Sequence, residues 1–467
     1  MLGNVCIFQK KMPPLQNVLK PQAFYNNLNA GYAIAIEMKR IILTATWVAS
    51  AIFATAQSGT NSPYSQYGFG TLADQSNGFN RGMNGLGVAY REGKQINFLN
   101  PASYSAVDSL TFIFDVGLSG QITNFEENGK KLNANNANFE YAMGAFRAFK
   151  HVGMSFGVVP FSNVGYSYSV TNNVGDTRST TYTNTYNGSG GLHQAFVGIG
   201  WELFKGFSVG ANGSYLWGSF DKSVVNNYSD PYVNTLSKYY STEITSYKVD
   251  LGVQAAIPLS KKSNVTLGAT YSLPHNLGAD PQCLVISNNS QTGVADTASY
   301  VVRDGLKLPA TISGGVMLNL NNKLRIGADY QLQKWAEVGF PEYNVNNGVS
   351  SYANNEKYFD DRQKFTLGGE YCKNVNSRKF FDRIRFRAGA SYATPYYYVN
   401  GQDGPKEISV SAGLGIPINN VWNSRSLLNI SGQWVRTSAD GLIKENTFRI
   451  NVGITFNERW FMKWKVE

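Results

Sequence analysis

The sequence is poor in the residues that build most metal and redox sites. It has three histidines and three cysteines among 467 residues. The histidines, His151, His193 and His275, are scattered and do not show the spacing of metal ligands. Two distal cysteines are too few for a disulfide scaffold, and their spacing leaves open whether they pair: they are Cys283 and Cys372. We therefore predict no metal, no cofactor and no disulfide framework.

The chain also lacks runs of basic residues. Its formal net charge is +10, yet lysines and arginines are spread along the chain with no run of five or more. The glycine pattern Gly82-x-x-Gly85-x-Gly87 does not follow a strand and open a helix, as a phosphate loop would. Carboxylate pairs such as Asp360-Asp361 are typical of solvated loops. The sequence therefore predicts neither a nucleic-acid partner nor an enzyme.

No hydrophobic run after residue 56 is long enough for a membrane-spanning helix. The one short apolar run, 41–53, follows Lys39-Arg40 and precedes Ala54-Thr55-Ala56. A basic flank, a short apolar core and a small-x-small site predict a signal peptide at 38–56, with Gln57 as the mature N-terminus. Residues 1–37 are then an over-extended start. For the segment 38–56, the alternative to a signal peptide is a buried N-terminal helix. We expect the protein to be exported.

What the chain does have is a repeated strand pattern. In the segment 383–392, apolar side chains alternate with polar ones: Ile384, Phe386, Ala388, Ala390 and Tyr392 against Arg383, Arg385, Arg387, Gly389 and Ser391. Successive side chains of a strand point to opposite faces, so one face is apolar and the other carries three guanidinium groups. The same alternation recurs at 247–257, 264–273, 323–332 and 447–456. The pattern predicts an all-β chain of about 13 to 16 strands.

Three features favour a lipid-facing barrel over a soluble β-sandwich or solenoid. The apolar faces last about nine to eleven residues, the length with which a tilted strand crosses a bilayer. Short turns at 261–262 and 321–322 contrast with polar stretches at 171–190, 221–243, 275–305 and 336–360, which we interpret as long external loops. Inward arginines suit a wet lumen better than a dry core. We predict a transmembrane antiparallel β-barrel over 108–467, in a Gram-negative outer membrane.

The segment 57–107 differs from the rest. It is rich in Gly, Asn and Ser and lacks sustained alternation. Glycines allow tight turns and close approach to a wall, and Phe98, Leu99 and Tyr104 offer apolar anchors. We interpret the segment as an N-terminal plug in the lumen; the alternative is a flexible tail.

These elements together resemble the FadL/TodX family of outer-membrane transporters for hydrophobic compounds. The resemblance rests on Gly82-x-x-Gly85-x-Gly87-x-Ala89 ahead of Asn100-Pro101-Ala102, which is similar to the plug region of that family. It also rests on the segment 308–316, Leu-Pro-Ala-Thr-Ile-Ser-Gly-Gly-Val, and on Leu-Gly-Ala-Thr-Tyr at 267–271. The composition resembles the Bacteroidetes branch. One departure is the C-terminal end, where the last strand is either 447–456 or 459–466.

The resemblance implies a 14-stranded barrel with a plug and passive uptake of hydrophobic solutes such as long-chain fatty acids. It also implies an exit at a kink in an early strand, which we place at 157–165, bordered by Gly157, Pro160 and Gly165, because proline cannot donate to a sheet ladder. The alternative there is an ordinary strand end.

Three arginines, Arg383, Arg385 and Arg387, are candidates to bind a solute carboxylate in the lumen. The alternative is that they form salt bridges inside the lumen with residues such as Asp250, Asp329 or Glu370. The expected partners of the whole protein are outer-membrane lipid, lipopolysaccharide and the hydrophobic solute.

A second function stays open, because some Bacteroidetes relatives are secretion-system components or scaffolds that bind partner proteins. A barrel lipase with a Ser/His pair is the third alternative, although no local signal selects such a pair. The sequence does not define the solute, the exit route or the oligomeric state.

Overall fold

The computed structural model describes residues 59–175, 180–418 and 426–459. The over-extended start at 1–37, the signal peptide at 38–56 and the candidate strand 459–466, beyond its first residue, lie outside the described residues.

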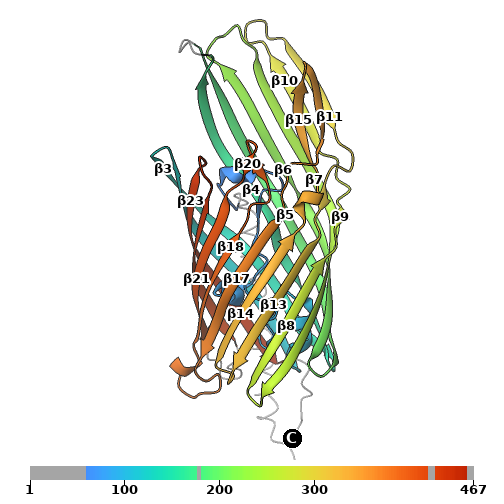
Figure 1. Cartoon of the computed structure of the whole chain (residues 1–467), viewed down its shortest axis with the longest axis vertical. Coiled ribbons are helices and arrows are strands. Elements are labelled where there is room, and N and C mark those ends of the chain that lie inside the picture. Colours follow the sequence, from blue (N-terminus) through green and yellow to red (C-terminus); the bar gives the residue numbers. More distant parts are fainter. Residues whose placement is uncertain (1–58, 176–179, 419–425, 460–467) are drawn as a thin grey trace, which may run out of the picture. The chain divides into compact units, whose positions relative to one another are not determined.

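Fourteen long antiparallel strands form a closed barrel (Figure 1). Each strand pairs with the next one along the wall, and the last strand, β23, pairs with the first, β2, so the ring is complete. This confirms the reading in which 447–456 belongs to the closing strand. The barrel strands are β2 (Thr111–Glu127), β3 (Lys130–Phe149), β4 (Val152–Asn173), β5 (Thr181–Phe204), β6 (Phe207–Tyr228), β7 (Thr235–Ser260), β8 (Ser263–Ser272), β13 (Thr311–Leu320), β14 (Leu324–Gln333), β17 (Arg362–Cys372), β18 (Arg385–Ala393), β21 (Lys406–Pro417), β22 (Leu427–Ser438) and β23 (Lys444–Arg459).

Burial along these strands is inverted relative to a soluble protein. On β21, Ser409 and Ser411 are buried in the interior, while Ile408 and Val410 are each 47% exposed on the outside. The same holds on β2, where polar side chains from Asp115 onward alternate with exposed apolar ones. An apolar outer face and a polar inner face are what a wall between lipid and a lumen requires.

The two ends of the barrel differ. At the foot of Figure 1 the strands are joined by tight turns at 150–151, 205–206, 261–262 and 321–323, and short turns are typical of the periplasmic end. At the other end, β5, β6 and β7 continue far beyond the wall, and β7 alone has 26 residues. The prediction of long loops at 171–190 and 221–243 is therefore wrong over most of their length. These Thr-, Tyr- and Val-containing stretches extend the strands, because such residues have high β propensity.

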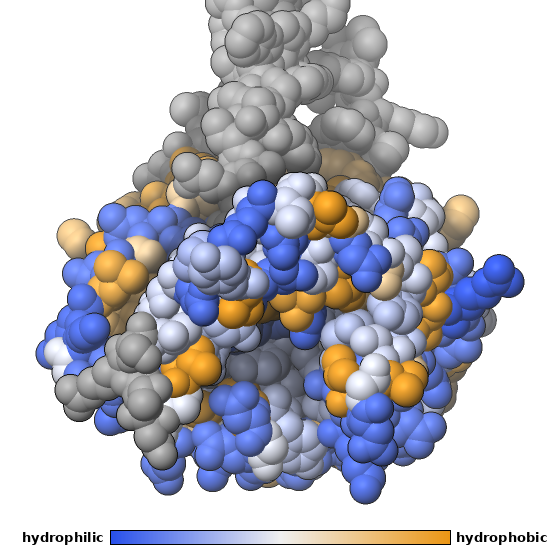
Figure 2. All heavy atoms as spheres, turned by 90° about the horizontal axis from the view of Figure 1, so that it is seen from above, coloured by the Kyte–Doolittle hydropathy of each residue, from blue (hydrophilic) through white to orange (hydrophobic). Residues whose placement is uncertain are grey.

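Shorter elements cover this loop end. β10 (Gln282–Asn288) pairs with the extension of β7 and with β11 (Ala295–Val301). The remaining pairs of short strands are β9 (His275–Asn276) with β12 (Lys307–Leu308), β15 (Phe340–Asn346) with β16 (Val349–Asn355), and β19 (Tyr398–Val399) with β20 (Gln402–Asp403). Figure 2 shows that this end is largely polar and hollowed near its centre.

The N-terminal segment, 59–107, packs against side chains of the barrel interior. It contains the 3-10 helices η1 (Pro63–Gln66) and η2 (Pro101–Ala106), the two-residue strand β1 (Thr71–Leu72) and the single-turn helix α2 (Gly78–Arg81). Two further 3-10 turns lie between strands: η3 (Trp335–Glu337) and η4 (Phe381–Arg383). Among the described residues, no helix is both long and apolar enough to span a bilayer.

Candidate functional site

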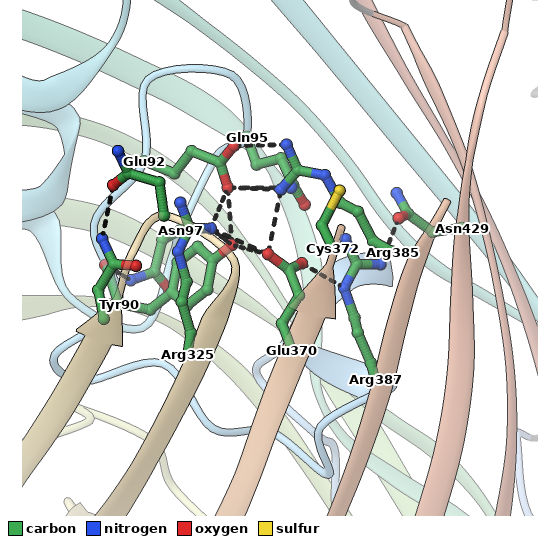
Figure 3. Close-up of polar contacts among 12 residues, drawn as sticks. Tyr90, Glu92, Gln95, Asn97, Arg325, Glu370, Cys372, Arg385, Arg387 and Asn429 are labelled. Atoms are coloured by element: carbon green, nitrogen blue, oxygen red, sulfur yellow. Dashed lines mark hydrogen bonds and ion pairs between the residues drawn. The ribbon is translucent and has the colours of Figure 1, made fainter. Parts of the chain in front are cut away.

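The N-terminal segment is tied to the barrel wall by a buried ion network near the periplasmic end (Figure 3). Arg385 of β18 binds the Glu92 carboxylate with both terminal nitrogens, at 2.8 and 2.7 Å. Arg325 of β14 donates to the same carboxylate at 2.8 Å and to the Tyr90 hydroxyl at 2.6 Å. Two strands of the wall thus hold one acidic residue of the segment.

A second carboxylate, Glu370 of β17, completes the network. It accepts hydrogen bonds from Arg325 at 2.9 Å, from Arg385 at 3.2 Å and from Arg387 Nε at 2.8 Å. Arg387 also donates to Asn429 at 2.7 Å. The sequence placed Arg385 and Arg387 on the inner face and named Glu370 as an alternative partner, and both points are confirmed.

Arg383 lies outside the strand that carries Arg385 and Arg387. Strand β18 begins at Arg385, and Arg383 lies in η4 on the turn before it. The expectation that three arginines share one strand face is therefore wrong for Arg383, because the alternation of the sequence continues two residues beyond the paired strand. The proposed role of these arginines in binding a solute carboxylate stays a prediction.

Electrostatics keep Glu92 ionised inside the barrel. Burial on its own would raise the pKa of this carboxyl. The guanidinium groups of Arg385 and Arg325 outweigh burial and hold its pKa well below the ordinary value. Breaking a buried pair by removing one partner is costly, because the other charge stays buried without compensation. The network is therefore a strong attachment point for the segment.

The Asn100-Pro101-Ala102 motif is a second attachment point. Asn100 caps η2 through its side-chain oxygen, which accepts from the Ala102 N–H at 3.0 Å, and Pro101 takes the first helical position. The Asn100 amide donates to the carbonyls of Val88 in the segment and Val253 in β7, at 2.8 and 3.1 Å. The motif thus joins a helix start to the wall.

Glycines of the wall make room for η2. A Cβ at Gly210 of β6 would lie 2.4 Å from the Pro101 carbonyl carbon, and one at Gly252 of β7 would lie 2.2 Å from the Asn100 side-chain oxygen. Neither distance is tolerated by real Cβ atoms. These two positions need glycine because the start of η2 lies directly against the sheet, with the Pro101 backbone over Gly210 and the Asn100 and Pro101 side chains over Gly252.

The wall itself is interrupted between β3 and β4. Pairing of these strands runs from Phe149–Val152 to Ala142–Val158 and then stops. Beyond this point β3 continues along β2 only, whereas β4 continues along β5 with a bulge between Pro160 and Ser162. Beyond Ala142 and Val158, the edge of β3 that faces β4 and the edge of β4 that faces β3 are therefore not paired with each other. We call these the free edges of the two strands.

The N-terminal segment takes the place of β3 along the free edge of β4. Strand β1 pairs with Ser162 and Asn163, and the Ala73 N–H donates to the Phe161 carbonyl at 2.9 Å. Further along, the Gly165 N–H donates to Ser65 Oγ at 3.0 Å. Of the residues expected at an opening, Gly157 lies in the last paired stretch, while Pro160 and Gly165 lie on the free edge.

The first described residues lie at the same break. Gly59 accepts a hydrogen bond from Asn138 of β3 at 2.9 Å, and a Cβ on it would lie 2.7 Å from Asn163 of β4. Asn61 donates to Asn136 of β3 at 3.1 Å. Residues 59–61 therefore lie between the two separated strands.

On the loop side of the segment lies an apolar cluster. Phe69 is fully buried, with its ring centroid 5.5 Å from Trp335 and 5.9 Å from Phe340. Lys222 of β6 reaches into this cluster and donates to the carbonyls of Gln66 and Gly68, both at 2.8 Å. The cluster is buried; its other members include Tyr64, Leu216, Phe220, Leu306, Phe359 and Tyr396.

The histidines and cysteines are dispersed. His275 lies 3.0 Å from the Ser246 hydroxyl, a contact that sequence reasoning missed because the two residues belong to different elements. Its second ring nitrogen has no hydrogen-bond partner within the described ranges, so no group there orients the ring as a catalytic triad would. Cys283 and Cys372 are free thiols. In the described part of the chain, no group of three His, Cys, Asp or Glu is placed to hold a metal.

Sequence reasoning also missed Glu92 and the pairing of β1. A signal for Glu92 existed, because Asp74 and Glu92 are the only acidic residues of 57–107, ahead of a barrel with inward arginines. No signal marked β1, which is only two residues long.

Comparison with known proteins defines the family and the fold. A family model described as BamG matches residues 38–467. The chain belongs to the BamG family. No curated protein matches the sequence significantly.

Three solved structures similar to this BamG-family chain carry the fold assignment. The Ralstonia pickettii toluene transporter TbuX has a TM-score of 0.55 at 15% identity, covering 83% of this chain and 99% of that one. The P. putida toluene transporter TodX gives 0.56 at 12%, with 84% and 100% covered. A Pseudomonas aeruginosa FadL homologue gives 0.56 at 12%, also with 84% and 100% covered. At these identities the likeness concerns the fold alone.

The resemblance to FadL and TodX is therefore confirmed as a shared barrel architecture, while the sequence family is BamG. A closed 14-stranded antiparallel barrel with an apolar outer face is the architecture of Gram-negative outer-membrane proteins, so this BamG-family protein is located in that membrane. Its assignment to a Bacteroidetes branch stays a prediction.

Proposed function

We propose that this BamG-family protein is a passive outer-membrane transporter for hydrophobic compounds such as long-chain fatty acids. The observation that carries the proposal is the break between β3 and β4, where pairing stops after Ala142–Val158. An apolar solute that leaves a barrel through its wall enters lipid directly and does not have to cross water. The names of the similar structures, which include toluene transporters and a monoaromatic hydrocarbon channel, support the same class of solute.

In this proposal the N-terminal segment acts as a plug that controls the route. The apolar cluster around Phe69 receives the solute from the loop end, which is hollowed in Figure 2. The solute then moves toward the free edge of β4 between Pro160 and Gly165. The contacts of residues 59–61 with Asn138 and Asn136 must open for the solute to pass.

A disulfide across the break tests this route. Asn61 and Asn136 are in side-chain contact, so N61C/N136C would fix the segment to β3 when oxidised. We expect uptake of a labelled long-chain fatty acid into proteoliposomes to fall when the disulfide is formed and to recover on reduction. The N61C single variant is the control. Equal uptake by the oxidised and reduced double variant contradicts the route.

A second candidate function is a scaffold that binds partner proteins, including secretion-system components. The observation that favours it is the filled interior, because Phe69, Trp335 and the residues around Glu92 are buried with their polar groups largely paired. A barrel held shut in this way would use its extended loop end for contact with a partner. Absence of uptake by the reduced N61C/N136C variant and by wild type, with a protein that co-purifies, would favour this function.

A further inference from the structure

Three neighbouring turns lie at the periplasmic end, at the foot of the barrel in Figure 1. The turn at 260–263 is joined to the turn at 321–323 by the Asn322 N–H, which donates to the Lys262 carbonyl at 3.0 Å. The second turn is joined to the third, 373–384, by the Cys372 N–H, which donates to the Lys323 carbonyl at 2.8 Å. We call these three turns the basic rim.

The basic rim carries an excess of positive charge. Its exposed basic residues are Lys261, Lys262, Lys323, Lys373, Arg378 and Lys379. Asp382 is the only acidic residue in the three turns, and it pairs with Lys373 at 2.9 Å. The other five form no ion pair with any carboxylate in the ranges that the structure describes. Apart from the electrostatic effect of Lys379 on Asp382, these five cations are left to interact with groups outside the protein.

The longest of the three turns is ordered by its own hydrogen bonds. The Asn374 N–H donates to the Asp382 carbonyl at 2.9 Å, and Ser377 donates to the Asp382 carboxylate at 3.0 Å. The turn presents Phe381, which is 79% exposed and packs edge-to-face on Phe380 with 5.6 Å between centroids. The turn therefore places an exposed aromatic ring close in sequence to two exposed basic residues, Arg378 and Lys379.

The apolar outer face of the barrel leads directly to this rim. Leu259 is the last outward apolar side chain of β7 and is 58% exposed, two residues before Lys261. Tyr371 has the same place on β17, is 45% exposed and lies two residues before Lys373. The basic groups thus lie just past the edge of the lipid-facing band, at the depth of the headgroups.

We propose that the basic rim binds anionic phospholipid headgroups of the periplasmic leaflet. The basic residues of the rim contact the phosphate groups. Phe381, Leu259 and Tyr371 contact the adjoining acyl chains, on the side of the lipid-facing band. Continuity with the lipid-facing band favours a lipid over a protein as the occupant, because a lipid in the leaflet meets both parts at once. The inference does not depend on transport, since it uses only the barrel and its orientation.

Native mass spectrometry of the full-length protein tests the proposal. Protein is released from mixed micelles that contain phosphatidylglycerol and phosphatidylcholine in equal amounts, and the lipids retained are counted. We expect wild type to retain phosphatidylglycerol preferentially. The variant K261Q/K262Q/K379Q should lose about tenfold or more of this preference, since each basic residue near a surface contributes to the attraction of anionic lipid.

A matched control removes the same charge from the other end of the barrel. Lys130, Lys131 and Lys357 are exposed there, so K130Q/K131Q/K357Q should keep the preference of wild type. The variant F381S should weaken retention of both lipids. Heat-dependent gel mobility checks that every variant is a folded barrel.

Three results would overturn the proposal. Equal retention of the two lipids by wild type would do so, and so would equal loss in the rim variant and its control. If phosphatidylglycerol retention is unchanged in K261Q/K262Q/K379Q while a co-purifying protein is lost, the rim binds an acidic protein partner instead.

Discussion

Arg385 holds the Glu92 carboxylate with two parallel hydrogen bonds, across 293 residues of sequence. This one contact joins the last third of the barrel to the segment inside it. The pair is almost fully buried, since the Arg385 and Glu92 side chains are 4% and 10% exposed. Much of the attachment of the segment at this end depends on it.

The variant E92Q should loosen the N-terminal segment. It leaves Arg325, Arg385 and Arg387 to share a single carboxylate, Glu370. Removal of one partner of a buried pair costs about 3 kcal/mol or more. We expect faster cleavage within 59–107 in limited proteolysis and a lower unfolding temperature. As a control, E126Q removes an exposed carboxylate 3.9 Å from Lys131 and should change neither, because exposed pairs contribute little. Identical proteolysis of E92Q and wild type would contradict the role of the network.

The same pair predicts how attachment of the segment depends on pH. The folded-state pKa of Glu92 lies well below its ordinary value of 4.5. Its contribution to stability is therefore fully present above that value and is lost as the pH falls through the lower folded-state pKa. We expect limited proteolysis of 59–107 to stay at its neutral-pH rate down to about pH 4.5 and to accelerate below it. A loss of protection that begins near neutral pH would show that another group controls attachment.

The glycines beneath η2 predict a position-specific effect. A side chain at Gly210 would collide with the Pro101 backbone, whereas Gly213 on the same strand has nothing within 4 Å of a Cβ. G210V should therefore destabilise the protein by about 1–3 kcal/mol and expose a cysteine introduced at Ala102 to a thiol reagent. G213V should leave both unfolding and labelling unchanged. Similar behaviour of the two variants would mean that η2 does not lie against β6 in solution.

Pro160 lies just beyond the point where β4 stops pairing with β3. We expect its replacement to change uptake. A valine there restores a backbone N–H that proline lacks and allows the strand to pair more regularly. We expect P160V to reduce uptake of a labelled fatty acid severalfold while the folded barrel keeps its gel mobility. Unchanged uptake by P160V would remove 157–165 from the proposed route.

Much of the wall was predictable from local alternation. The segment 385–392 shows why. Side chains of a strand point alternately inward and outward, so the face on which each residue lies follows from its place in the sequence alone. Phe386 faces outward as this rule predicts and is 51% exposed. The extensions of β5 to β7 were not predictable in this way. These extensions are rich in polar Asn, Ser and Thr residues, so they have no apolar face and show no alternation by which a strand could be predicted. They are held as strands because β5, β6 and β7 continue to pair with one another beyond the wall.

The contacts of the candidate site needed three-dimensional information. Glu92 meets Arg325 and Arg385 only because strands far apart in sequence converge around the segment. Strand β1 is only two residues long, and it pairs with β4 where β3 no longer does. Its position therefore depends on where the pairing of β3 with β4 stops, which the sequence of β1 does not show. Asn100-Pro101-Ala102 could be recognised as a motif, but the glycines that receive it, Gly210 and Gly252, lie on two different strands of the wall.

The short ladder between β3 and β4 also has a mechanical consequence. It joins the two strands over only the stretch from Ala142–Val158 to Phe149–Val152, whereas β4 and β5 are joined from Val152–Trp201 to Asn173–Thr181. Under a pulling force, the seam with the fewest backbone hydrogen bonds yields first. Extraction of the chain from a bilayer by an atomic-force tip should therefore open the cylinder first at this seam.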